Sequence, residues 1–171
     1  MKKWLKRFGY TILFLFAALN IICAFQAYHF IHFYDNITLK KPEEMGFMEK
    51  TGAMLLGVDY PKATVVDSLK SPHTNITVTT EDNLKLAAWQ LKHAADSQSA
   101  KGAIIMFHGH ASSRSGVVNE ADNFYNLGWN VLTVDFRAHG KSEGNTCSVG
   151  YYETKDVKAA YDFVVASGEK N

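Results

Sequence analysis

The chain has 171 residues, with 18 Lys and Arg, 17 Asp and Glu, and a formal net charge of +1 at pH 7. Four of the basic residues and none of the acidic ones lie in the first 34 positions, so the remainder carries three more acidic than basic residues. Without a basic surface, nucleic acid is not an expected partner. Two cysteines, Cys23 and Cys147, are too few for a disulfide framework or a cysteine-based zinc site.

A long uncharged segment follows the basic N-terminal residues 1–9. The run Tyr10–Phe33 has 24 residues without a formal charge. As a helix it would extend ~36 Å, enough to cross a hydrocarbon core of ~30 Å with some tilt. We therefore predict a transmembrane helix over residues 10–34 that acts as a signal anchor, with the lipid bilayer as its partner.

The charges around this segment predict its orientation. The basic cluster lies on the N-terminal side, whereas the residues after the span mix both signs. The N-terminus is then expected in the cytoplasm and the following domain on the extracytoplasmic side. The alternative is a cleaved signal peptide and a secreted domain, although Phe25 and Gln26 stand where a signal peptidase site needs small residues.

Residues 35–59 are expected to be a linker with a possible short helix. Pro42 followed by Glu43 and Glu44 is typical of a first helical turn. Gly46, Gly52 and other glycines weaken that helix prediction.

A β-hairpin is predicted next. Polar and apolar residues alternate over 76–80 and again over 84–90, and the polar segment 81–83 between them is suited to a turn.

The remaining segments alternate between strand and helix patterns. Apolar runs at 103–107 and 131–135 predict strands buried on both faces. Apolar residues within 117–125 and 157–165 fall on one helical face, and Gly128 and Gly168 follow as stop signals. A strand, helix, strand, helix order after a hairpin predicts an α/β sheet.

Four segments, in this order and spacing, carry a resemblance to a known family. They are TVTTEDNLKLAAWQL, IIMFHGH, VLTVDFRAHGKSEG and ETKDVKAAYDFV. Together they resemble the N-terminal half of an α/β-hydrolase, closest to the serine hydrolases of the Bem46-like and serine-aminopeptidase-like branches. The resemblance covers about residues 60–171 and implies a partial α/β-hydrolase domain there. Two departures are small: Asn83 and Ala138 stand where the family usually has glycine.

The resemblance implies a serine hydrolase that cleaves an ester, thioester or amide through an acyl-enzyme, without a cofactor. The family's nucleophile lies on a G-x-S-x-G elbow, followed by the acid and the histidine. That elbow is not reached by Asn171, so the chain is expected to be truncated before the nucleophile and inactive as it stands. Ser148, in TCSVG, lacks a preceding strand and is expected to be an ordinary loop or helix-start serine. The alternative is a non-catalytic remnant or a membrane-anchored fragment that binds a partner.

The resemblance also implies half of an oxyanion hole. In this family a backbone N–H just after His-Gly stabilises the developing oxyanion, which assigns it here to His110, with Ala111 as the neighbouring candidate. His108 is expected to form hydrogen bonds at the strand end. A metal site built from His108, His110 and His139 is not favoured, because no carboxylate stands at a suitable spacing, so no metal is expected.

The other polar candidates have structural explanations. Asp135 and Arg137 are expected to tie the loop to the strand end, and Glu143 to be solvated. The helix dipole is sufficient to explain why the acidic residues Glu153 and Asp156 stand in the first turn of the predicted helix. Cys147 would need a neighbouring base to act as a nucleophile, and the sequence nominates none.

Overall fold

The computed structural model describes residues 2–93 and 100–168. It divides into two compact units: one is Met1–His32 with Asn36–Pro61, and the other is Phe33–Asp35 with Lys62–Asn171. Most of the predicted linker 35–59 therefore belongs to the same unit as the apolar helix.

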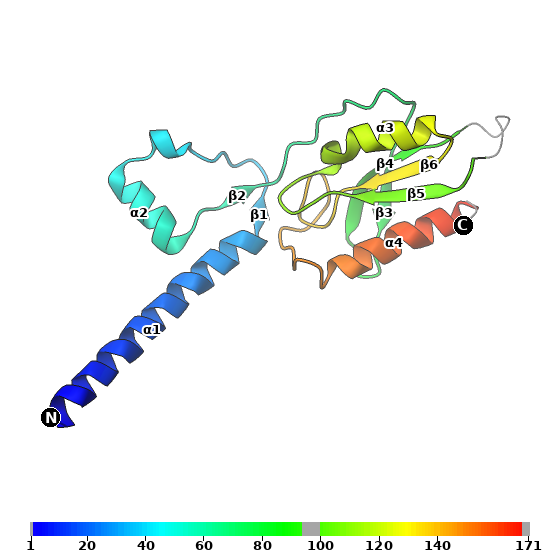
Figure 1. Cartoon of the computed structure of the whole chain (residues 1–171). Helices are drawn as coiled ribbons and strands as arrows, with labels where there is room; N and C mark the ends of the chain where they lie inside the picture. The colour runs from blue at the N-terminus through cyan, green and yellow to red at the C-terminus, as the bar shows by residue number, and fades with distance from the viewer. Residues whose placement is uncertain (1, 94–99, 169–171) are drawn as a thin grey trace. The chain divides into compact units, whose positions relative to one another are not determined.

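The first unit contains the helix α1 (Lys2–Ile31), coloured blue in Figure 1. Its segment Lys3–Ile31 has a mean hydropathy of 2.1 in its most apolar window, and is long and apolar enough to cross a membrane. A signal sequence near an N-terminus has the same property. The helix begins before the predicted start at residue 10, because Lys and Arg are good helix formers and continue the helix into the basic segment. It ends at Ile31, before the predicted end at residue 34, and after His32 the short strand β1 (Phe33–Tyr34) begins, which belongs to the second unit.

The first unit also contains a short 3₁₀ turn η1 (Pro42–Glu44), the helix α2 (Phe47–Leu56) and the two-residue strand β2 (Tyr60–Pro61). The helix thus starts after Gly46, whose N–H donates to the Glu49 carboxylate at 3.0 Å. The Gln26 amide of α1 donates to the carbonyls of Ala53 and Met54 at 3.2 and 2.8 Å. These two bonds fix the C-terminal turn of α2 against α1.

The second unit is built on a four-stranded mixed sheet. Its strands are β3 (Thr74–Thr79), β4 (Lys85–Leu91), β5 (Ala103–Phe107) and β6 (Asn130–Val134), in the order β3-β4-β6-β5. The β3–β4 and β4–β6 pairs are antiparallel, and β5 runs parallel to β6. The hairpin prediction is confirmed, with Asn83 in the left-handed backbone region at φ 63°.

Two helices complete this unit. The 3₁₀ turn η2 (Arg114–Val117) leads into α3 (Val118–Asn126) between β5 and β6, and α4 (Glu153–Ala166) follows β6. The two helices lie on opposite faces of the sheet (Figure 1). The predicted α/β class is confirmed.

Each face of the sheet has its own apolar core. On one face, residues of β3, β4 and β6 pack with α4; the buried members are Val78, Leu86, Ala88, Leu132, Val134, Ala159 and Ala160. On the other face, β4 and β6 pack with α3; the buried members are Trp89, Leu91, Val118, Ala121 and Val131. Strand β6 is therefore packed against α4 on one face of the sheet and against α3 on the other.

The predicted burial of the two parallel strands is correct for β6 only. All five residues of β6 are buried, whereas all five of β5 are half-buried. The strand order explains the difference, since β6 has neighbours on both sides and β5 is the last strand of the described sheet.

Candidate functional site

A cavity of about 190 Å³ opens where β5 and β6 end. Its lining comes from the loops after both strands and from the segment before α4: His108, Gly109, His110, Phe136, His139, Cys147, Val149, Gly150 and Glu153. Ligands of α/β sheets bind outside the carboxyl ends of the strands. The position, and the imidazole, thiol and carboxylate groups among its lining residues, make this cavity the candidate site.

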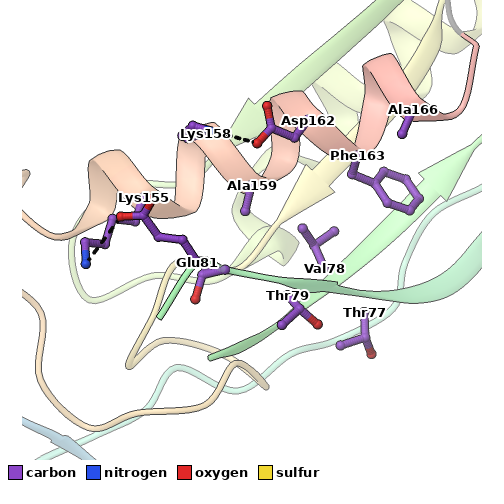
Figure 2. Close-up of a pocket in the computed structure, with 11 residues that line it drawn as sticks. Thr77, Val78, Thr79, Glu81, Lys155, Lys158, Ala159, Asp162, Phe163 and Ala166 are labelled. Atoms are coloured by element: carbon purple, nitrogen blue, oxygen red, sulfur yellow. Dashed lines mark hydrogen bonds and ion pairs between the residues drawn. The ribbon is translucent and has the colours of Figure 1, made fainter. Parts of the chain in front are cut away.

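A second, larger cavity of about 430 Å³ lies between β3 and α4 (Figure 2). Its charged side chains pair with one another: Lys155 lies 3.4 Å from Glu81, and Lys158 lies 2.5 Å from Asp162. The apolar side chains of Val78 and Phe163 come from the core beneath. The buried hydroxyl in its lining, that of Thr80, donates to Asp82 at 2.6 Å, so we assign no chemistry to this cavity.

Two buried imidazoles connect the loops that follow β5 and β6. His108, after β5, donates from Nδ1 to the Gly109 carbonyl at 2.7 Å and accepts the Phe136 N–H at Nε2, at 3.1 Å. His139, after β6, donates from Nδ1 to the Arg137 carbonyl at 2.9 Å and accepts the Ala111 N–H at Nε2, also at 3.1 Å. Each loop therefore supplies an imidazole that holds a backbone N–H of the other.

These hydrogen bonds require neutral imidazoles with the proton on Nδ1. Burial lowers the pKa of His108 and of His139, which favours that neutral form. The predicted hydrogen-bonding role of His108 is confirmed. The role of His139 was not predicted, because its partner Ala111 lies 28 residues away in the sequence.

The two oxyanion-hole candidates lie in the loop after β5, and His110 lines the cavity. Ala111 has a left-handed backbone, with φ 55°, and its N–H is donated to His139. The side chain of His110 is exposed, and its Nδ1 lies 3.7 Å from Cys147 Sγ. The backbone N–H of Ala111 therefore ties the loop after β5 to the loop after β6.

Asp135, at the end of β6, is fully buried and accepts several hydrogen bonds. It accepts the Arg114 N–H at 2.6 Å, the Arg114 guanidinium at 2.5 Å and the Lys141 N–H at 2.9 Å. The predicted structural role of Asp135 is confirmed, and its partner Arg114 ties η2 to β6.

Arg137 connects the loop after β6 to α4 and to the hairpin turn. Its guanidinium donates to Asp156 at 2.7 and 3.0 Å and to Asp82 at 3.0 and 3.3 Å. Burial alone would lower the pKa of Arg137, but the two carboxylates outweigh burial and raise it. In turn, the guanidinium and the Thr80 hydroxyl hold the pKa of Asp82 well below its usual range.

The predicted explanation of Asp156 and Glu153 by the helix dipole is incomplete. Asp156 is fully buried and is the ion-pair partner of Arg137. Glu153, also buried, accepts the N–H groups of Ser148 and Gly150 at 2.8 and 2.7 Å. Both carboxylates therefore organise loops through direct contacts.

Ser148 is an ordinary loop serine, one of the two alternatives predicted, and lies before the start of α4. Its hydroxyl donates to Glu153 at 2.7 Å and accepts the Tyr152 N–H at 2.6 Å. Glu143 is exposed, as predicted, and its carboxylate accepts the Lys85 N–H at 2.9 Å.

Cys147 was given no role from the sequence, but it lines the candidate site. Its side chain is buried, and burial raises the pKa of its thiol. The structure supplies the neighbouring base that the sequence did not nominate, since His110 lies 37 residues away in the chain. Donor atoms of His110, His139 and Cys147 all lie within 4.8 Å of one another. The group of potential metal ligands in the structure therefore contains Cys147 in place of His108, which was considered from the sequence.

Comparisons with known proteins agree with this architecture. A family model described as serine aminopeptidase, S33, matches residues 98–171. The uncharacterized protein YqkD of Bacillus subtilis is 43% identical over 54 residues, which are 32% of this chain and 18% of YqkD. The uncharacterized protein Rv2307c of Mycobacterium tuberculosis is 27% identical over 108 residues, or 61% of this chain and 37% of that protein.

A solved structure is similar over most of the chain. The esterase Pf2001 of Pyrococcus furiosus is 32% identical with a TM-score of 0.53, over 62% of this chain and 42% of the esterase. In another crystal form the match has 25% identity and a TM-score of 0.53, and covers 80% of this chain. The chain spans less than half the length of these relatives. The sheet, its two flanking helices and these similarities define a hydrolase-like α/β fold. The family model and the esterase structure support an α/β-hydrolase superfamily member.

Proposed function

We propose that the protein is a membrane-anchored serine hydrolase that cleaves an ester, thioester or amide through an acyl-enzyme. The similarity to an esterase and to the serine aminopeptidase model supports hydrolysis of an acyl substrate. The long apolar helix α1 supports the anchor, and the basic residues at its start favour an N-terminus in the cytoplasm.

The observation that carries this proposal is the way the loop after β5 is held. Acyl transfer turns a carbonyl oxygen into an anion, which preorganised backbone N–H groups ~3 Å away stabilise. The reciprocal imidazole contacts of His108 and His139 fix the backbone of this loop at the cavity. Following the family resemblance, we assign the oxyanion contact to the backbone N–H of His110 and keep Ala111 as the neighbouring candidate.

The nucleophile is proposed to come from outside these 171 residues. A serine hydrolase needs a serine activated by an imidazole, with an acid behind it. Ser148 contacts Glu153 and Tyr152 instead, in a loop that does not follow a strand. We therefore assign the serine, the acid and the catalytic histidine to a longer product and expect the 171-residue chain alone to be inactive.

Labelling with a fluorophosphonate tests this proposal. Where the reading frame continues into a strand followed by G-x-S-x-G, we expect the longer product to react, and to lose the reaction when the elbow serine is changed to alanine. The 171-residue chain should remain unlabelled, with and without Ser148→Ala. Labelling of the 171-residue chain that Ser148→Ala abolishes would overturn the assignment. An unreactive longer product would favour a non-catalytic, partner-binding protein.

The anchor needs a separate experiment. We expect the expressed chain to stay in membranes during alkaline extraction, with its N-terminal residues intact by mass spectrometry. Protease added to sealed inverted vesicles should remove the basic N-terminal residues and spare the second unit. A soluble product that starts after residue 24 would show a cleaved signal peptide instead.

A further inference from the structure

The side chains of His110, His139 and Cys147 form a cluster of nitrogen and sulfur donors. They come from two loops: His110 follows β5, whereas His139 and Cys147 lie near the start and the end of the connection between β6 and α4. Their nitrogen and sulfur donors lie within 4.8 Å of one another. Such a group of imidazole and thiol donors is the ligand set that zinc prefers in proteins.

The distance between His110 and Cys147 fits a shared ion. Their donor atoms, Nδ1 and Sγ, are 3.7 Å apart. Zinc bonds of ~2.0 Å to nitrogen and ~2.3 Å to sulfur, at a tetrahedral angle, place two such donors roughly 3.6 Å apart. The exposed ring of His110 gives an ion access from solvent, while Cys147 lies behind it with its side chain buried.

His139 is already oriented as a metal ligand would be. Its Nδ1 donates to the Arg137 carbonyl at 2.9 Å, which leaves the lone pair on Nε2. A backbone carbonyl that accepts from the other ring nitrogen is the usual support of a metal-binding imidazole. His139 is 3% exposed, and the ring of Phe33 packs 4.5 Å from it, so the imidazole cannot easily turn away.

The third ligand also has a supported position. Cys147 stands directly before the turn that Glu153 holds through the N–H groups of Ser148 and Gly150. Both carboxylate oxygens of Glu153 are engaged in these bonds and in the bond to the Ser148 hydroxyl. Glu153 therefore acts as the support of the cysteine loop, and the ligand set consists of two imidazoles and one thiolate.

We propose that His110, His139 and Cys147 bind one Zn²⁺ ion through His110 Nδ1, His139 Nε2 and Cys147 Sγ, with the fourth position open to the cavity of about 190 Å³. Three protein ligands with an open fourth position are typical of zinc sites that hold a water or a small ligand. The lone pair that binds the ion is the one that now accepts the Ala111 N–H. Zinc therefore replaces the hydrogen bond between Ala111 and His139.

Metal titration of the full 171-residue chain tests this site without depending on hydrolysis. The tag-free chain in detergent micelles is freed of metal with a chelator and titrated with Zn²⁺ against a chromophoric competitor. We expect one Zn²⁺ per chain. Co²⁺ in place of Zn²⁺ should give a thiolate-to-cobalt absorption band in the near ultraviolet.

Substitutions identify the ligands. Cys147→Ser and His110→Gln should each weaken Zn²⁺ binding by at least about tenfold, and Cys147→Ser should remove the thiolate band. Cys23→Ser and His73→Gln are matched controls outside the site and should bind as the unchanged chain does. His110 is exposed, so His110→Gln keeps the test valid even if Cys147→Ser alters folding. Absence of saturable one-to-one binding, binding without a thiolate band, or unchanged affinity in His110→Gln would each overturn the proposal.

Discussion

Arg137 and Asp156 form a buried ion pair that joins the loop after β6 to the first turn of α4. The Asp156 carboxylate accepts the Arg137 N–H at 2.9 Å as well as two guanidinium contacts at 2.7 and 3.0 Å. Asp156 is fully buried and Arg137 is 4% exposed. Because the loop that begins at Arg137 also carries His139, this pair positions one wall of the candidate site.

Asp156→Asn is expected to destabilise the second unit strongly. It removes the charge that compensates the buried guanidinium, and Asp82, with a side chain 31% exposed, remains as its only other carboxylate contact among the described residues. We expect a loss of about 3 kcal/mol in the free energy of unfolding, at the lower end for a broken buried pair. Denaturation of the full chain in detergent, followed by tryptophan fluorescence, measures it. Asp162→Asn, on the exposed side of the same helix, is the control and should change stability little. Equal effects of the two variants would contradict the buried-pair interpretation.

Gly140→Ala is expected to be more harmful than another glycine substitution in the same loop. Gly140 has φ 51°, and a Cβ there would overlap the carboxylate of Asp135. Gly144 also has a positive φ, of 85°, but the nearest atom to its Cβ would be 3.7 Å away. Gly144→Ala should therefore cost only about 1 kcal/mol of backbone strain.

Gly140→Ala should lower the free energy of unfolding by at least about 2 kcal/mol more than Gly144→Ala does, because the Asp135 carboxylate must move away from its hydrogen-bond partners. The comparison of the two variants in the same unfolding assay isolates the clash from the backbone strain. Similar losses in both would show that the carboxylate adapts without cost.

The strands and helices of the second unit could be predicted because their signals are local. Alternation over 76–80 and 84–90 marks β3 and β4, and the apolar runs mark β5 and β6. The different burial of β5 and β6 was not predictable from two similar apolar runs. It follows from the order of strands in the sheet, which is a property of the tertiary structure.

The candidate site was harder to predict because its contacts join distant residues. The loop after β5 could be singled out from His-Gly at a strand end, but the partners Ala111 and His139 are 28 residues apart. Asp156 looked like an ordinary acid in a first helical turn, since the local pattern of a dipole-stabilising carboxylate and that of a buried ion-pair partner are the same. Only packing distinguishes them, as the full burial of Asp156 shows.

The buried imidazole of His108 predicts a loss of stability on mild acidification. Burial lowers the pKa of His108 in the folded state, whereas an unfolded histidine titrates near ~6.5. The contribution of neutral His108 to the free energy of unfolding is complete above pH ~6.5. It declines as the pH falls below this value, because the unfolded state then binds the proton more readily than the folded state. The free energy of unfolding measured at several values between pH 8 and pH 5 should decline less steeply in His108→Gln.

His73 supplies a control of opposite sign for that experiment. Burial alone would lower the pKa of His73, but the Ser71 carbonyl and the Asp67 carboxylate outweigh it and raise the pKa. The contribution of protonated His73 to the free energy of unfolding is complete below pH ~6.5. It is lost as the pH rises through the pKa of His73 in the folded state. His73→Gln should therefore make the decline on acidification steeper. If both variants shift the profile in one direction, the assignment of the buried neutral imidazole to His108 is wrong.

Cys147 is expected to be protected from thiol reagents in the folded protein. Its side chain is 2% exposed, and burial raises the pKa of its thiol, so both access and the thiolate fraction are reduced. In a Cys23→Ser background, which leaves a single thiol, reaction with a maleimide should be slower in the native chain than in denaturant by roughly tenfold or more. Glu153→Gln should speed the native reaction, because it weakens the contacts to Ser148 and Gly150 that hold the loop after Cys147. Glu143→Gln, an exposed control in the loop after β6, should leave the rate unchanged. Fast labelling of the native chain would mean that the thiol is open to solvent and that the loop before α4 does not cover it.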